Sequence, residues 1–169
     1  MLLSRDELII TLFRETDRAQ RMKTPLAVIL CGIAEWESWK AKLSHEALVE
    51  VQRQLADRMI FALRCYDSGG ACGDGKFGLV LPGCNSFSAV ALAERLNSAA
   101  FGVPITAGHE DLNLSGCFGV AGSGGRSPLV VLRNAEDALR KASALGPGSI
   151  ERSSYDAQPD PSTPVACRW

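Results

Sequence analysis

The 169-residue sequence lacks several features that would assign it to a specialised class of protein. It has only two histidines, and none of its six cysteines forms a Cys-x-x-Cys pair, which argues against a zinc site. No apolar run approaches the roughly 20 residues needed to cross a bilayer. Acidic residues appear near the N-terminus, at Asp6 and Glu7, where a signal peptide would have an uninterrupted apolar stretch. With a net charge of −1, nothing attracts nucleic acid or a membrane. These absences predict a cytoplasmic protein that binds neither.

The composition is that of an ordinary globular domain, with 46% hydrophobic and 22% charged residues. The chain is long enough for one domain with its own core. The cysteines lie mostly in or beside apolar runs, and we expect them to be reduced packing residues. The sequence after Arg152 is rich in Ser, Asp and Pro. It predicts a disordered tail over residues 153–169, with the folded domain over residues 1–152.

The apolar periodicity predicts helices that alternate with strands. Ser4 and Glu7 fit a capping box at the start of a helix over residues 4–22. Pro25 precedes the apolar run 26–31, which is typical of a strand buried on both faces. Further helices are predicted around Trp36 and Trp39 and at 44–63, 85–100 and 128–145; further strands are predicted at 66–72, 77–81 and 113–122. The order predicts an α/β sandwich with a mainly antiparallel central sheet flanked by helices.

The most distinctive motifs lie between Arg64 and Phe77. Together they resemble the signature of the GGDEF family, the diguanylate cyclases of bacterial signalling. The family's hairpin reads Gly-Gly-Asp/Glu-Glu-Phe, where this chain has Gly73-Asp74-Gly75-Lys76-Phe77. Upstream, the family's product-binding pattern Arg-x-x-Asp is kept as Arg64-Cys-Tyr-Asp67. Other matching segments, spread over residues 3–150, are Pro25–Ala27, Phe77–Pro82, Ala93–Leu96, Phe118–Ala121 and Ala135–Leu139. The resemblance implies the nucleotidyl-cyclase fold of this family.

The resemblance also implies that catalysis has been lost. Joining two GTP molecules needs Mg²⁺ held by carboxylate oxygens. The family takes these from an Asp-x-Asp after the first strand and from the hairpin, where this chain has Gly32-Ile-Ala34 and Gly75-Lys76. The positions that contact guanine and phosphates in the family correspond here to Lys40, Ala41, Ser143 and Pro147. We therefore expect no cyclase activity and no metal cofactor.

A ligand site is nevertheless kept. In the family, the Arg-x-x-Asp motif and an arginine on the helix after the hairpin form the product site for cyclic di-GMP, and these positions are Arg64, Asp67 and Arg95. An arginine fork can bind the O6/N7 edge of guanine, and a carboxylate can accept from the opposite edge. Family sites usually hold a ligand dimer with a second protein surface. The main hypothesis is an inactive cyclic di-GMP receptor whose ligand bridges a homodimer or joins it to a protein partner.

Other interpretations stay open. Arg64 and Asp67 can form an ordinary surface ion pair, and the chain can be a nucleotide-independent interaction scaffold with a vestigial cyclase fold. Residual GTP binding without turnover and an active cyclase are further alternatives. Asp74 fits a plain turn better than a shifted metal ligand, and His45 fits a helix start better than a ligand role. Four arginines that could supplement the product site are Arg18, Arg21, Arg53 and Arg58.

Overall fold

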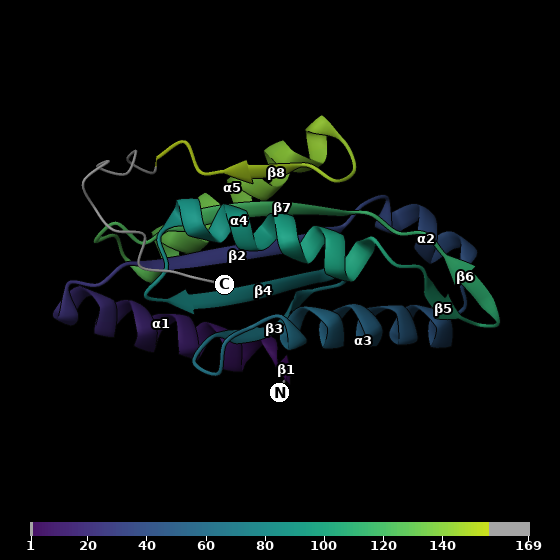
Figure 1. Ribbon diagram of the computed structural model, residues 1–169, viewed down its shortest axis with the longest axis horizontal. Coiled ribbons are helices and arrows are strands. Elements are labelled where there is room, and N and C mark those ends of the chain that lie inside the picture. The colour runs from purple at the N-terminus through teal and green to yellow at the C-terminus, as the bar shows by residue number, and fades with distance from the viewer. Residues whose placement is uncertain (1, 156–169) are drawn as a thin grey trace.

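The computed structural model describes residues 2–155, which form a layered α/β structure (Figure 1). The strands are β1 (Leu2–Leu3), β2 (Leu26–Ile33), β3 (Ser68–Gly73), β4 (Lys76–Pro82), β5 (Ile105–Ala107), β6 (Glu110–Leu112), β7 (Gly116–Gly122) and β8 (Ile150–Arg152). The helices are α1 (Arg5–Met22), α2 (Trp36–Lys42), α3 (His45–Phe61), α4 (Ser86–Leu96) and α5 (Pro128–Leu145), and α4 continues as a π-helix, η1 (Asn97–Phe101).

The main sheet has six strands in the order β1-β3-β4-β2-β7-β8. Its central pairs, β3–β4, β4–β2 and β2–β7, are antiparallel, as predicted. The edge pairs β1–β3 and β7–β8 are parallel, so the sheet is mixed. The sequence analysis missed β1, β8 and the small β5–β6 hairpin because strands of two or three residues are too short to show a period. The predicted flanking helices are all present in the described part of the chain.

Side chains alternate along β2 between two separate cores, as the pleat of a strand requires. Ala27, Ile29 and Cys31 belong to the core under α3 and α4. Leu26, Val28 and Leu30 belong to the core under α1 and α5. The uninterrupted apolar run of β2 therefore reflects a central strand covered on both faces.

Side-chain caps set the starts of four helices. Ser4 and Glu7 form the predicted capping box, in which the Ser4 backbone N donates to Glu7 Oε2 at 2.7 Å and the Glu7 backbone N donates to Ser4 Oγ at 3.3 Å. Ser44, Asn85 and Ser127 each accept from a backbone N–H in the first turn of α3, α4 and α5, respectively. These polar caps lie immediately before apolar stripes, which is why the helix starts were predictable.

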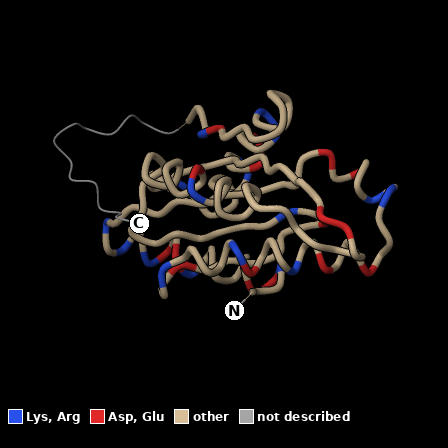
Figure 2. The backbone as a smooth tube through the Cα atoms, turned by 45° about the vertical axis from the view of Figure 1, so that its right-hand side comes forward, with Lys and Arg blue, Asp and Glu red and all other residues tan. Residues whose placement is uncertain are grey.

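Past β8 the chain stays on the sheet, since the Ser153 backbone N donates to the Val120 carbonyl at 2.7 Å. The rest of the predicted tail, residues 156–169, lies outside the described residues, and so does Cys167. The other five cysteines carry free thiols. Among the described residues, no helix is long and apolar enough to cross a membrane. Figure 2 shows basic and acidic residues interspersed along the helices.

Candidate functional site

The loop after α3 holds Arg64 and Asp67 in direct contact. Arg64 Nε donates to Asp67 Oδ2 at 3.1 Å and Nη2 donates to Oδ1 at 3.2 Å. The Arg64 backbone N also donates to Oδ2 at 3.0 Å. The Asp67 side chain is 0% exposed and that of Arg64 is 18% exposed. A two-pronged pair in a partly buried setting fixes the orientation of the guanidinium group. In this conformation Asp67 positions Arg64 and presents no oxygen to solvent.

Tyr66, inside the same motif, stacks on the arginine. The Arg64 Cζ lies 4.5 Å from the Tyr66 ring centroid, and the tyrosine is 56% exposed. Arg64 Nη2 also donates to the Pro82 carbonyl at 3.4 Å, which ties the loop to the end of β4. Arginine planes stack on tyrosine rings and on nucleobases through the same face. This role of Tyr66 was not predicted from the sequence, although an aromatic residue between the two motif positions was an available signal.

Arg95 lies on the exposed side of α4. Contacts along α3 indicate its position relative to Arg64. Gln54 Nε2 donates to the β5 backbone at 2.7 Å, and one turn later Arg58 Nη1 donates to the Ala100 carbonyl at 2.9 Å. The two segments therefore run in opposite directions, as Figure 1 shows. Arg64, which follows Arg58 along the chain, and Arg95, which precedes Ala100, lie on the same side of the Arg58–Ala100 contact. Within residues 2–155 the Arg95 side chain has no hydrogen bond or ion pair, so only the side chains of Arg64 and Asp67 are joined directly.

Three of the four supplementary arginines are engaged elsewhere. Arg53 pairs with Glu50 at 2.6 Å on the outer face of α3. The Arg58 guanidinium donates to carbonyl groups at the end of η1 and the loop after it. Arg21 pairs with Asp17 at 3.2 Å on α1. These contacts stabilise local structure and do not extend the Arg64 surface.

The positions that correspond to the family's metal ligands come together at one end of the sheet. Gly32 of β2 is in register with Lys76 of β4, and the Ile33 backbone N donates to the Gly75 carbonyl at 3.0 Å. Gly32, Gly75 and the adjoining Ala34 have no side-chain oxygen. Across the described residues, no group of three or more His, Cys, Asp and Glu side chains could hold a metal ion.

Trp36 covers the hairpin turn. Gly75 has a φ of 67°, and a Cβ built on it would lie 2.7 Å from the Trp36 ring. The Gly75 backbone N donates to Gln52 Oε1 of α3 at 3.1 Å, which anchors the turn. A side chain at position 75, such as the acidic residue of the family pattern, would require the indole to move. The sequence analysis placed Trp36 on a helical turn but did not connect it to the hairpin, because the contact depends on the sheet register.

The other hairpin residues have structural roles. Asp74 Oδ2 lies 2.8 Å from Lys40 Nζ, and this hydrogen bond lowers the pKa of Asp74 and raises that of Lys40. Asp74 is therefore part of a surface ion pair. Phe77 is buried in the core under α3 and α4. Gly73 ends β3 and pairs with Lys76 across the turn. His45 is exposed at the start of α3, as expected of a helix-start residue.

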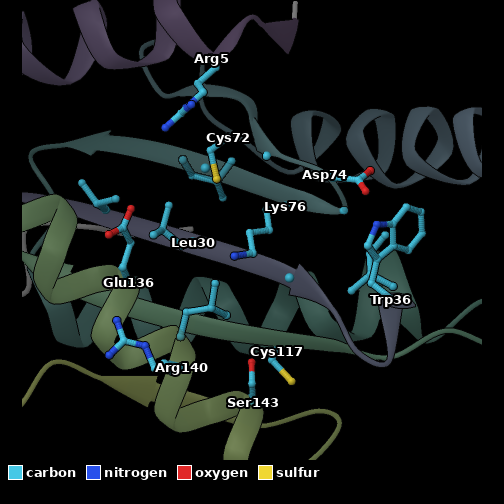
Figure 3. Close-up of a pocket in the computed structure, with 18 of the residues that line it drawn as sticks. Arg5, Leu30, Trp36, Cys72, Asp74, Lys76, Cys117, Glu136, Arg140 and Ser143 are labelled. Carbon is cyan, nitrogen blue, oxygen red and sulfur yellow. The ribbon is translucent and has the colours of Figure 1, made fainter. Parts of the chain in front are cut away.

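A cavity of about 970 Å³ opens beside the hairpin, between α1, α5 and one face of the sheet (Figure 3). Its walls are largely apolar and include Leu8, Leu12, Val28, Leu30, Val80 and Leu139. Charged side chains line its rim, among them Arg5, Lys76, Glu136 and Arg140. Ser143 and Pro147, the positions of the family's phosphate contacts, lie on the same rim. This apolar volume was not predicted from the sequence, because it arises from the packing of two helices that are distant in sequence.

The sequence of this chain matches a known protein family. The model of the family described as diguanylate cyclase, GGDEF domain, matches residues 1–148. The chain belongs to the GGDEF family. It is 26% identical over 130 residues to the response regulator PleD of Caulobacter vibrioides. The match covers 75% of this chain and 29% of PleD, so this GGDEF domain spans less than a third of that curated relative.

Solved GGDEF structures share the fold. The GGDEF domain of YfiN (TpbB) from Pseudomonas aeruginosa superposes with a TM-score of 0.85 at 23% identity, covering 92% of this chain and 98% of that one. The DgcB GGDEF domain from Caulobacter crescentus, in complex with c-di-GMP, gives 0.84 at 17% identity with 90% and 91% coverage. The active GGEEF domain of a Vibrio cholerae diguanylate cyclase gives 0.83 at 23% identity with 92% and 100% coverage. These similarities confirm the predicted fold.

Proposed function

We propose that this GGDEF domain is a catalytically inactive receptor that binds cyclic di-GMP through Arg64, Asp67 and Arg95. Binding would change its association with a second copy or with a protein partner. The observation that carries the proposal is a contrast between two sites. The Arg64 guanidinium is oriented by the buried Asp67 carboxylate at the surface, whereas the metal-ligand positions beside the hairpin offer no carboxylate at Gly32 or Gly75.

Each of the three residues has a defined role in the proposed site. The Arg64 fork recognises the O6 and N7 acceptors of guanine, a pattern that adenine does not offer. Asp67 acts as a positioning residue, because its side chain is 0% exposed and bonded to Arg64. Arg95 supplies a second cation, which stacks on a base or pairs with a phosphodiester. Tyr66 occupies one face of the Arg64 plane, so a guanine that stacks there must displace the ring.

Two relatives support the ligand and the mode of signalling. The DgcB GGDEF domain of Caulobacter crescentus was solved in complex with c-di-GMP. The diguanylate cyclase SiaD of Pseudomonas aeruginosa was solved in complex with its activator SiaC. Proteins that contain a domain of this fold therefore form complexes with this dinucleotide or with another protein, and we infer the same two kinds of partner here.

Calorimetric titration with cyclic di-GMP tests the receptor function. We expect saturable binding at micromolar ligand, and we expect cyclic di-AMP to bind far more weakly because adenine presents an amino donor where guanine presents O6. Light scattering on the same samples reports whether the ligand produces a dimer. The absence of binding heat up to high micromolar ligand would contradict the receptor and favour the nucleotide-independent scaffold.

A cyclase assay tests the loss of catalysis. We expect no cyclic di-GMP after incubation with GTP and either Mg²⁺ or Mn²⁺, since no carboxylate stands at positions 32 and 75 to hold the cation and Lys76 repels it. Chromatography of the nucleotides gives the readout, with the active Vibrio cholerae GGEEF domain assayed in parallel. Metal-dependent product formation would overturn the inactive assignment.

A further inference from the structure

The cavity between α1 and α5 is a second candidate ligand site, independent of Arg64. Its volume of about 970 Å³ is at the upper end of the range typical of small-molecule sites. The deep wall consists of leucine and valine side chains from both helices and from β2 and β4. Polar side chains that could read the edge of a nucleobase do not line this deep part. This part of the cavity therefore suits the apolar portion of a ligand.

Two cations from opposite walls face the mouth of the cavity. Lys76 extends from the start of β4 and Arg5 from the first turn of α1, and Figure 3 shows both directed toward the space between the helices. Neither side chain has a hydrogen bond or ion pair within the described residues. The Cys72 thiol lies between Arg5 and Lys76 in the same cavity (Figure 3), and its burial there raises its pKa. The mouth therefore presents Lys76 and Arg5 without ion-pair partners in the part of the chain that the structure describes, with Glu136 beside them.

We propose that this cavity binds an amphiphilic carboxylate of the fatty-acid type, with no metal ion. The tail lies against Leu8, Leu30 and Leu139, where burial of each methylene is favourable. The carboxylate head binds Lys76 and Arg5, since charge-assisted hydrogen bonds to a carboxylate are the strong ones. In the family pattern, position 76 carries an acidic residue. The lysine here reverses that charge and converts the mouth from cation binding to anion binding.

A nucleoside triphosphate fits this cavity less well than a monoanion. Glu35, Glu37, Asp74 and Glu136 also line the rim, and they repel a polyanion whose charge no bound cation offsets. Arg140 pairs with Asp137 at 2.9 Å and Asp74 pairs with Lys40 at 2.8 Å. The carboxylates Glu35 and Glu136, which are unpaired within residues 2–155, and the cations Lys76 and Arg5 therefore decide the charge at the mouth. A single carboxylate needs only the Lys76 and Arg5 pair, and its tail gains from the apolar wall that a ribose would leave unfilled.

Titration with dodecanoate below its micellar concentration, in EDTA, tests the proposal. Trp36 lines the cavity, so tryptophan fluorescence and calorimetry both report binding. We expect saturable one-to-one binding, weaker binding of dodecanol and none of dodecyltrimethylammonium. Lys76→Gln should weaken binding about tenfold through loss of one charged contact, and Glu136→Gln should strengthen it roughly twofold by removing a like charge.

A steric variant separates the cavity from nonspecific adsorption. A Cβ on Gly32 would lie 3.8 Å from a Leu139 methyl group, so Gly32→Leu can fold and project into the cavity. We expect this variant to melt at or above the temperature of the wild type and to lose dodecanoate binding, while Arg53→Ala binds as the wild type does. Non-saturating binding, or binding unchanged by both Lys76→Gln and Gly32→Leu, would overturn the proposal. Metal-free GTP that binds more tightly than dodecanoate would also overturn it.

Discussion

Replacing Arg64 by alanine should reduce cyclic di-GMP affinity at least about 100-fold, a loss of about 2.7 kcal/mol. Asp67 and the Pro82 carbonyl accept from Nε and Nη2 of the guanidinium, so the proposed guanine contact exchanges part of these bonds, and one good bidentate guanine contact is worth about 1–3 kcal/mol. Alanine removes both prongs of the fork and its stacking plane. Calorimetric titration of the purified variant gives the measurement.

The same substitution has a structural cost that the experiment must separate from binding. It leaves the buried Asp67 carboxylate without its side-chain partner, which should lower the free energy of unfolding by about 1–3 kcal/mol. Arg64→Lys keeps a cation beside Asp67 but lacks the fork, so we expect it to recover stability without recovering affinity. Arg53→Ala, an exposed arginine of α3, should bind as the wild type does. A folded Arg64→Lys protein with unchanged affinity would falsify the assigned role of the fork.

Gly119→Ala should be among the most destabilising single-methyl changes in the domain. Gly119 of β7 packs directly under α5, and a Cβ there would lie 2.7 Å from Leu139 Cα and closer still to the Ala135 carbonyl. Both neighbours are backbone atoms of a long helix, in which one atom cannot move without displacing the rest of the turn. We expect the free energy of unfolding to fall by about 3 kcal/mol and the melting temperature by roughly 6–12 °C.

Gly32→Ala provides the matched control for that result. Gly32 also faces α5 from a central strand, but its Cβ would meet only Leu139 methyl groups at 3.8 Å or more. This substitution should be neutral or stabilise by about 0.5–1 kcal/mol, because glycine loses more backbone entropy on folding than alanine. Urea unfolding of both variants gives the comparison. Equal effects of the two substitutions would contradict the close packing of α5 on Gly119.

The long elements of the fold could be predicted because each has a local signal. The capping box of Ser4 and Glu7 and the apolar run of β2 are readable within a few residues. The short edge strands are different, since β1 and β8 form by pairing with β3 and β7, which lie far away in sequence. Phe13 follows the buried Leu12 in the apolar pattern of α1, yet it is 44% exposed. Periodicity alone does not show where the core-facing stripe ends.

The candidate site was predictable in its motif and not in its surroundings. Arg64 and Asp67 lie three residues apart, so their contact follows from local geometry. Trp36 packs over Gly75 only because the fold brings together residues about forty positions apart in the sequence. The pairing of Lys40 with Asp74 depends on the same packing. The apolar cavity depends on the separation of α1 from α5. No spacing pattern in a single sequence encodes that separation.

The hydrogen bond between Gln52 and the Gly75 turn links α3 to the hairpin as one rigid unit. The Gln52 amide oxygen accepts from the turn at Gly75 near the middle of α3, while Arg64 follows the C-terminal end of the same helix. The nine residues of helical rise from Gln52 to Phe61 correspond to roughly 14 Å, and a helix of this length is stiff. A spectroscopic label at either end will therefore follow one rigid body, so a ligand that tilts the Arg64 end should be detectable at the hairpin turn.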